Sequence, residues 1–403
     1  MIKKLPIVPS DLRGMARLAV DATTGMTDLV EAVHDSIGHP LEPSQDPRSA
    51  GGRGFKGLVY GAIRAAARAL GSGVDLALTP FEWMQSAPPS SPEREALLAA
   101  LNGVLGDHLA ATGNPMAIPM SLRFGGQPLE LDAADLGAAI PEPSSRLLVL
   151  LHGLCRNDLQ WTQNGHDHGS ALALELGFTP IYLRYNSGLH VSTNGQAFAG
   201  LLESLLARWP RPVESLTILA HSMGGLVARS ACHHAREAKQ AWLGTLRHLI
   251  FLGTPHHGAP LERGGHWIDR VLEASPFAGP FARLGKIRSA GITDLRHGNL
   301  LDSDWQGHDR FAHGKDTRTH VPLPEGVRCC AVAATNGKNT DSLKDRLLGD
   351  GLVPVDSALG RHKEAKRCLA FPENAVLVVP GMNHLELLAS LQVYEQLRRW
   401  LAD

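Results

Sequence analysis

The sequence of 403 residues lacks an excess of charge of either sign. Lysine and arginine total 39, against 40 aspartate and glutamate residues. Nucleic acids and anionic bilayers attract proteins through basic surfaces, and this composition provides no such surface. We therefore expect no nucleic-acid partner, and a small neutral substrate fits the composition better.

Cysteines are also few. There are five, an odd number, and two of them are adjacent at Cys329 and Cys330. Such a set does not form a disulfide framework, so we expect the chain to reside in a reducing compartment. The first residues, "MIKKLPIVPSDLRGMARL", contain prolines and charges before any apolar core of a secretory signal develops. We therefore expect a cytoplasmic protein.

No uninterrupted hydrophobic stretch is long enough to suggest a membrane span. The best candidate, residues 57–78, contains Arg64, Arg68 and Asp75. A single spanning helix would bury these charges at a cost of several kcal/mol, on the order of 3 kcal/mol for each one. This segment therefore indicates a helix that packs on protein.

The sequence has no fingerprint of a phosphate loop or a dinucleotide site, since the pair Gly224-Gly225 lacks the spacing downstream. Twenty histidines are present, but the paired ones have no cysteine or carboxylate at a recognised metal-ligand spacing. The pairs are His166 and His168, His233 and His234, and His256 and His257. We expect neither a cofactor nor a catalytic metal, and Asp356 alone is thin support for a structural calcium ion.

The first 113 residues have the pattern of helices. Apolar residues recur at steps of three and four from Leu12 to Ile37, with Ser10 as the expected N-cap. An Ala-rich helix is expected over residues 56–78, and a third helix begins at Ser91 and Pro92. We expect an N-terminal helical region over residues 1–113.

Residues 114–403 have a different pattern, that of an α/β domain. A hairpin is expected over residues 120–131, and short apolar runs then alternate with helical segments. The expected strands are residues 146–153, 180–185, 217–220, 248–253, 329–334 and 375–379. Near-continuous apolar strands indicate a mostly parallel sheet covered on both faces. Residues 254–327 interrupt this alternation, and their position in the sequence favours a lid insertion.

Ser222 lies where a strand pattern changes to a helix pattern. It is the centre of "AHSMG", which is G-x-S-x-G with Ala220 in the first position. Small residues at both ends allow a sharp turn that exposes the serine hydroxyl, as in a nucleophile elbow. An ordinary helix cap would also favour serine here. The residues farther along the chain distinguish the two interpretations.

A serine nucleophile needs a histidine base and a carboxylate that orients this base. In an α/β domain of this kind they follow the serine along the chain, first the acid and then the histidine. His384 lies after the last expected strand, in "PGMNHLELL", and is our candidate base. Asp350 lies in a Gly-Asp-Gly turn after the preceding strand and is the leading candidate acid. Asp341, Asp345 and Asp356 lie in the same stretch and stay open as alternatives.

The loop after the first parallel strand, "LLHGLCRND", is expected to supply half of an oxyanion hole. The N–H groups of Leu154 and Met223 would form the donor pair. Candidate residues around the substrate pocket are those that follow other strands: His152, Tyr185, His256 and His257.

The ordered set "LLVLLHGL", "LAHSMGGLVARS", "FLGTPHHGAP", "GDGLVPVDS" and "GMNHLELL" resembles the α/β-hydrolase superfamily. Within it, the set is similar to bacterial triacylglycerol lipases and to GPI inositol-deacylase-like hydrolases. The resemblance covers residues 115–403 and implies an α/β-hydrolase fold with Ser222, Asp350 and His384 as the triad. The substrate is not specified by these motifs.

The sequence therefore predicts a serine ester hydrolase that acts on small-molecule or lipid esters. An acyltransferase or thioesterase would use the same triad. A different class is a helical adaptor, in which the first 113 residues dock to a membrane or a partner and the hydrolase fold serves as a scaffold. Because these residues have a nearly balanced charge, we expect any peripheral membrane association to be apolar.

Overall fold

The computed structural model describes residues 8–37, 65–67, 69, 90–259, 288–310, 316–338 and 349–402, with the side chains of the first helix described up to residue 24. These residues belong to two compact units. One comprises Met1–Arg94 and Ala111–Met116, and the other comprises Glu95–Ala110 and Ala117–Asp403. The domain boundary near residue 113 stays a prediction. The expected helix over residues 56–78 lies almost entirely outside the described residues.

The first helix, α1 (Pro9–Ile37), begins one residue before the cap that the sequence suggested. The Ser10 cap was wrong because Pro9 suits the first helical position, where its missing N–H costs no hydrogen bond. The side chain of Asp11 instead accepts a hydrogen bond from the Val8 N–H, at 3.2 Å. In the same unit, Arg94 pairs with Asp11 at 2.6 Å.

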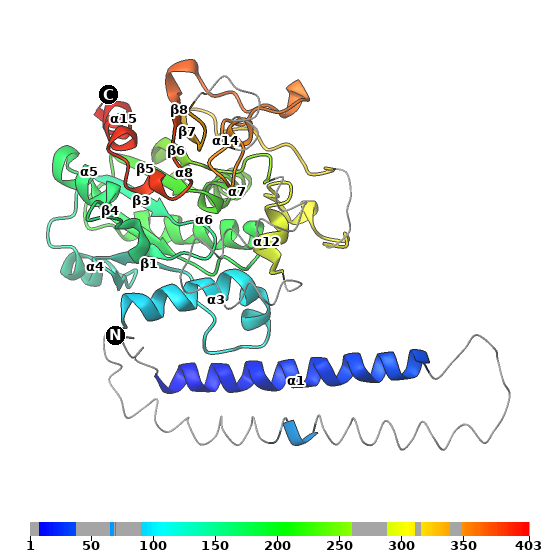
Figure 1. Cartoon of the computed structure of the whole chain (residues 1–403). Helices are drawn as coiled ribbons and strands as arrows, with labels where there is room; N and C mark the ends of the chain where they lie inside the picture. The colour runs from blue at the N-terminus through cyan, green and yellow to red at the C-terminus, as the bar shows by residue number, and fades with distance from the viewer. Residues whose placement is uncertain are drawn as a thin grey trace, which may run out of the picture. The chain divides into compact units, whose positions relative to one another are not determined.

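The second unit is built on one sheet of eight strands (Figure 1), in the order β2-β1-β4-β3-β5-β6-β7-β8. The strands are β1 (Ser121–Phe124), β2 (Gln127–Pro128), β3 (Arg146–Leu151), β4 (Thr179–Arg184), β5 (Ser215–His221), β6 (Leu246–Leu252), β7 (Arg328–Thr335) and β8 (Val376–Pro380). β1 is antiparallel to both of its neighbours, and β3 to β8 are parallel. The expected hairpin and mostly parallel sheet are confirmed.

Helices cover both faces of this sheet. They are α3 (Pro92–Ala111), α4 (Ala133–Ala139), α5 (His168–Leu176), α6 (Val191–Arg208), α7 (Met223–Glu237), α8 (Trp242–Thr245), α12 (Ala290–Asp294), α14 (Val355–Ala358) and α15 (Leu391–Ala402). The α6, α7 and α8 side chains share one apolar core with the sheet, and those of α5 and α15 share the other. In Figure 1, α15 and α5 lie beside each other at the same side of the sheet.

β3 shows why its sequence forms a central strand. Leu147, Val149 and Leu151 belong to the core under α6 and α7, and Leu148 and Leu150 belong to the core under α5 and α15. All five side chains are fully buried. Since successive side chains of a strand point to opposite faces, a strand buried on both faces must be apolar throughout.

The strand order and the two helical layers form an α/β-hydrolase fold, which the sequence resemblance implied. Much of the expected lid, residues 260–287 and 311–315, lies outside the described residues. The described part of that insertion contains α12, whose N-cap Ser289 accepts a hydrogen bond from the Ile292 N–H at 3.3 Å. The lid stays a prediction. Within the described ranges, no helix has both the length and the apolar character needed to cross a membrane.

Candidate active site

Ser222 occupies a sharp turn between β5 and α7. Its backbone has φ 54° and ψ −124°, a conformation that costs free energy in a residue with a side chain. The Ser222 N–H donates to the carbonyl oxygen of Leu252 on β6 at 2.8 Å, and its own carbonyl accepts from Gly225 at 3.0 Å. These bonds from the neighbouring strand and the first helical turn hold the strained serine in place.

The small residues around Ser222 are required by sterics. A Cβ atom on Gly224 would lie 2.7 Å from the carbonyl oxygens of both Leu151 and His152, because the first turn of α7 crosses the end of β3. Ala220 is fully buried on the other side of the serine. The sequence pattern predicted this close approach, and the turn has the geometry of a nucleophile elbow.

Asp350 and His384 are joined by a direct hydrogen bond. The His384 Nδ1 lies 2.7 Å from Asp350 Oδ2. Asp350 Oδ1 accepts two further bonds, from the N–H groups of Leu352 at 3.0 Å and Val353 at 2.8 Å. Both side chains are buried, and the carboxylate is fixed by the turn that carries it.

Of the other candidate acids, Asp356 is the one that the structure describes. Asp356 faces Arg361 at 3.7 Å, and its side chain is 41% exposed. Asp341 and Asp345 fall outside the described residues. Asp350 is therefore the candidate carboxylate that the structure places against His384.

His221 and Gly253 bring His384 to the elbow, and neither was singled out in the sequence. The His221 Nε2 donates to the His384 carbonyl oxygen at 3.1 Å, and the two rings lie 4.7 Å apart. A Cβ atom on Gly253 would lie 3.0 Å from His384 Cε1. The available signal was the position of His221 beside Ser222 in the motif. Burial holds the pKa of His221 well below 6.5, so the ring is neutral.

The loop after β3 lies against the serine, because a Cβ atom on Gly153 would be 2.9 Å from Ser222 Cβ. Among the described residues, no acceptor takes a hydrogen bond from the N–H of Leu154 or Met223. Cys155, which follows Leu154, donates its N–H to Ser187 Oγ at 3.1 Å. Burial raises the pKa of the Cys155 thiol to about 12, so the thiol stays protonated at neutral pH.

His152 and Tyr185 stack on each other with ring centroids 4.2 Å apart, and both are buried. The Tyr185 N–H donates to His152 Nε2 at 3.3 Å, so the ring proton sits on Nδ1, which donates to the Gly153 carbonyl at 2.8 Å. The Tyr185 hydroxyl donates to the His152 carbonyl at 2.8 Å. Burial lowers the pKa of His152 to about 3, and this neutral pair orders the loop beside the serine.

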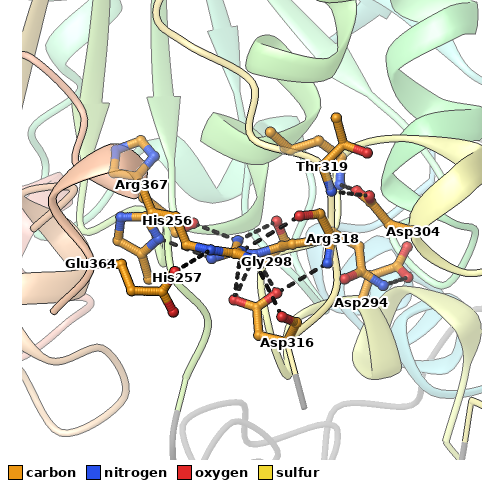
Figure 2. Close-up of polar contacts among 12 residues, drawn as sticks. His256, His257, Asp294, Gly298, Asp304, Asp316, Arg318, Thr319, Glu364 and Arg367 are labelled. Atoms are coloured by element: carbon orange, nitrogen blue, oxygen red, sulfur yellow. Dashed lines mark hydrogen bonds and ion pairs between the residues drawn. The ribbon is translucent and has the colours of Figure 1, made fainter. Parts of the chain in front are cut away.

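His256 and His257 contact a cluster of arginines, of which Figure 2 shows Arg318 and Arg367. His256 is fully buried, and its Nδ1 accepts from Arg229 at 3.4 Å. His257 accepts from Arg318 at 2.9 Å through Nδ1 and donates to the Gly360 carbonyl at 3.0 Å through Nε2. Their expected place at the substrate pocket stays a prediction.

The described residues contain no group of three or more histidine, cysteine, aspartate or glutamate side chains placed to hold a metal ion.

Parts of the chain are similar to one family model and to several solved structures. Residues 199–322 match the family model described as PGAP1-like alpha/beta domain. The matched range includes Ser222 but not Asp350 or His384. No curated protein matches the chain.

Three solved structures illustrate the similarity. The mature lipase of Bacillus licheniformis aligns with 17% identity and a TM-score of 0.43, over 70% of this chain and 98% of that one. The phospholipase PlaB of Legionella pneumophila aligns with 17% identity and a TM-score of 0.43, over 64% of this chain and 60% of that one. The esterase of the archaeon Pyrobaculum calidifontis aligns with 12% identity and a TM-score of 0.39, over 65% of this chain and 75% of that one.

Proposed function

We propose that the protein is a serine ester hydrolase that acts through an acyl-enzyme, with Ser222 as nucleophile, His384 as base and Asp350 as acid. The observation that carries this proposal is the 2.7 Å hydrogen bond between His384 and Asp350. The His384 ring lies 4.7 Å from that of His221, and His221 directly precedes Ser222, which is held at positive φ. A structural serine gains nothing from such strain, whereas a nucleophile gains an exposed and oriented hydroxyl.

In the proposed acylation step, the direction of proton transfer follows from the hydrogen bonds. The carboxylate of Asp350 can only accept, so His384 carries its proton on Nδ1 and its Nε2 has a free lone pair. Nε2 takes the Ser222 proton as Oγ attacks the ester carbonyl. Asp350 then stabilises the imidazolium that forms.

The tetrahedral intermediate has a negative oxygen that needs donors. We assign this role to the N–H groups of Leu154 and Met223, since the Gly153 loop contacts the serine and Met223 begins α7. The positive end of the α7 dipole lies at the same point and favours the anion. His384 then returns the proton to the leaving alcohol and activates water for deacylation.

The substrates that we propose are small-molecule or lipid esters with an acyl chain. Ser222 is only 6% exposed, so an ester must reach it through a covered site rather than from an open surface. The expected lid and the apolar pattern of the N-terminal helices favour an acyl substrate. Leu12 and Met15, on α1, are 43% and 47% exposed. Peripheral membrane association through these helices stays part of the proposal, and a vesicle flotation assay with the full chain would test it.

The function can be tested with a fluorophosphonate, which forms a covalent adduct with an activated serine. We expect an adduct on Ser222 in the full chain, located by peptide mass spectrometry, and none in Ser222→Ala. Hydrolysis of p-nitrophenyl esters of increasing chain length would then define the acyl preference, and an added alcohol would show whether water is the acceptor. A folded protein that gives no adduct and no turnover would overturn the proposal.

A further inference from the structure

Apart from the ester site, three arginines and three histidines surround one small cavity, which we call the arginine cavity. These residues are Arg229, Arg318, Arg367, His256, His257 and His320. Arg229 lies on α7, seven residues after Ser222, or about 10 Å farther along the helix axis. None of these six side chains takes a step in the proposed ester chemistry, although His256 and His257 were expected to lie at the substrate pocket.

Two of the three arginines have carboxylate partners. The Arg318 Nε donates to Asp316 Oδ1 at 3.1 Å, and Arg367 pairs with Asp316 at 3.2 Å and with Glu364 at 3.5 Å. The remaining nitrogens of Arg318 donate to the carbonyls of His256 and Gly298 and to the ring of His257 (Figure 2). The positive charges of these two arginines are therefore balanced by the carboxylates of Asp316 and Glu364.

Arg229 has no such partner. It is only 4% exposed, and its terminal nitrogens reach the His256 ring and the Val321 carbonyl, both uncharged. Its Nε is buried without a hydrogen bond, and no carboxylate among the described residues pairs with it. The Cys232 thiol nearby offers no charge, because burial raises its pKa to about 12. One buried positive charge is left over.

Besides the unpaired charge of Arg229, His256 has a ring N–H donor without an acceptor. Its Nδ1 faces a guanidinium, which can only donate, so in the neutral ring the proton sits on Nε2. That Nε2 is buried and has no partner among the described residues. Every charged group near the ring is cationic, and these neighbours together with burial keep its pKa well below 6.5.

A buried unpaired charge is costly unless a counter-charge accompanies it. We propose that the arginine cavity binds one small monovalent anion of the size of chloride, held by the positive charge of Arg229. The space suits such an ion, since the cavity has room for about one water-sized atom. Thr319 and His320 are exposed and leave it a route from solvent.

Bound there, the anion would link the middle of α7 to the residues that follow β6 and to residues 318–321. Anything that binds only the folded state raises the apparent stability in proportion to the logarithm of its concentration. Chloride should therefore raise the melting temperature of the full chain, and above its dissociation constant the rise should follow the logarithm of the chloride concentration.

The test compares thermal unfolding in sodium chloride and sodium gluconate mixed at constant ionic strength. We expect the melting temperature to rise by about 2 °C or more as chloride replaces gluconate. Arg229→Gln should abolish this rise. Arg236→Gln is the matched control on the same helix, because that side chain is 53% exposed, and it should keep the full response.

An equal response in Arg229→Gln and wild type, or no response in wild type, would overturn the proposal. Should Arg229→Gln fail to fold, crystals of the wild-type protein soaked in bromide provide a second test. An anomalous peak beside Arg229 supports the site, and a bromide-soaked crystal without a peak in the cavity rejects it.

Discussion

The two oxygens of the Asp350 carboxylate have separate tasks. Oδ2 receives the proton-bearing Nδ1 of His384, and Oδ1 is held by two backbone N–H groups. The carboxylate therefore cannot rotate away without losing bonds that are roughly twice as strong as neutral ones. This arrangement fixes both the orientation and the tautomer of the base.

For Asp350→Asn we expect kcat/KM for a p-nitrophenyl ester to fall about 10⁴-fold, because an amide can donate to Nδ1 and so favour the wrong tautomer. Steady-state kinetics would measure the loss, with circular dichroism to verify folding. The matched control is Asp356→Asn, which removes an exposed carboxylate six residues away and should keep wild-type turnover. Comparable losses in both variants would contradict the assignment of Asp350.

At the scale of elements, α3 supports the loops that carry the proposed oxyanion hole. A Cβ atom on Gly103 would lie 2.2 Å from Cys155 Sγ, and one on Gly106 would lie 1.9 Å from Asn186 Oδ1. These contacts are formed by the part of α3 that belongs to the same compact unit as the sheet. Glu95 of that part also pairs with Arg184 at the end of β4. The helix is therefore a structural part of the hydrolase unit.

Gly103→Ala should displace the backbone at Cys155 and thereby the neighbouring Leu154 N–H. We expect kcat to fall at least tenfold, with a lower melting temperature, since overpacking costs about 1–3 kcal/mol. Adding Cys155→Ala should restore much of the activity by removing the clashing sulfur. Gly137→Ala in α4 is the control, as its new Cβ would meet no atom within 4 Å. A fully active Gly103→Ala enzyme would refute this role of α3.

The same packing determines where the chain can be shortened. Removal of residues 1–88 keeps α3 and its cap, in which Ser91 Oγ accepts from the Arg94 N–H at 3.2 Å. We expect that protein to stay folded and to retain fluorophosphonate labelling of Ser222. Removal of residues 1–113 would take α3 away and expose the Cys155 and Asn186 loops, so we expect it to aggregate or lose labelling. Equal behaviour of the two truncations would argue against this view.

At the scale of the whole molecule, several histidines are buried in the neutral form. Burial lowers the pKa to about 3 for His152 and about 4 for His168, and the pKa of His221 also lies well below 6.5. Below pH 6.5 these histidines are protonated in the unfolded chain but stay neutral in the folded chain. Each such histidine then removes about 1.4 kcal/mol of stability per pH unit, until its folded pKa is reached.

We therefore expect the urea midpoint to be nearly constant from pH 8 to 7 and to fall steeply from pH 6.5 towards pH 5. Fluorescence-monitored unfolding at these pH values would measure it. His168→Gln should reduce the fall, because it removes one buried titrating group, while the exposed His308→Gln should leave it unchanged. A midpoint that stays constant down to pH 5 would contradict the neutral burial of these rings.

Much of the fold followed from local patterns. Apolar runs placed the parallel strands to within a few residues, and the small residues around Ser222 indicated the sharp turn, because both depend on neighbours in the sequence. The Ser10 cap was wrong for an equally local reason, since Pro9 takes the first helical position. The order of serine, acid and histidine was likewise visible along the chain.

The sequence by itself thus determined the α/β-hydrolase architecture and the candidate nucleophile and base, because strand periodicity and turn chemistry are short-range properties. Only the tertiary structure placed Asp350 against His384, set His221 and Gly253 beside the same ring, and gathered Arg229, Arg318 and Arg367 around one cavity. These groups come from different loops and helices. Gly253, Asp350 and His384 meet because they follow β6, β7 and β8, neighbouring parallel strands whose carboxyl ends lie at the same edge of the sheet. No local pattern encodes that alignment.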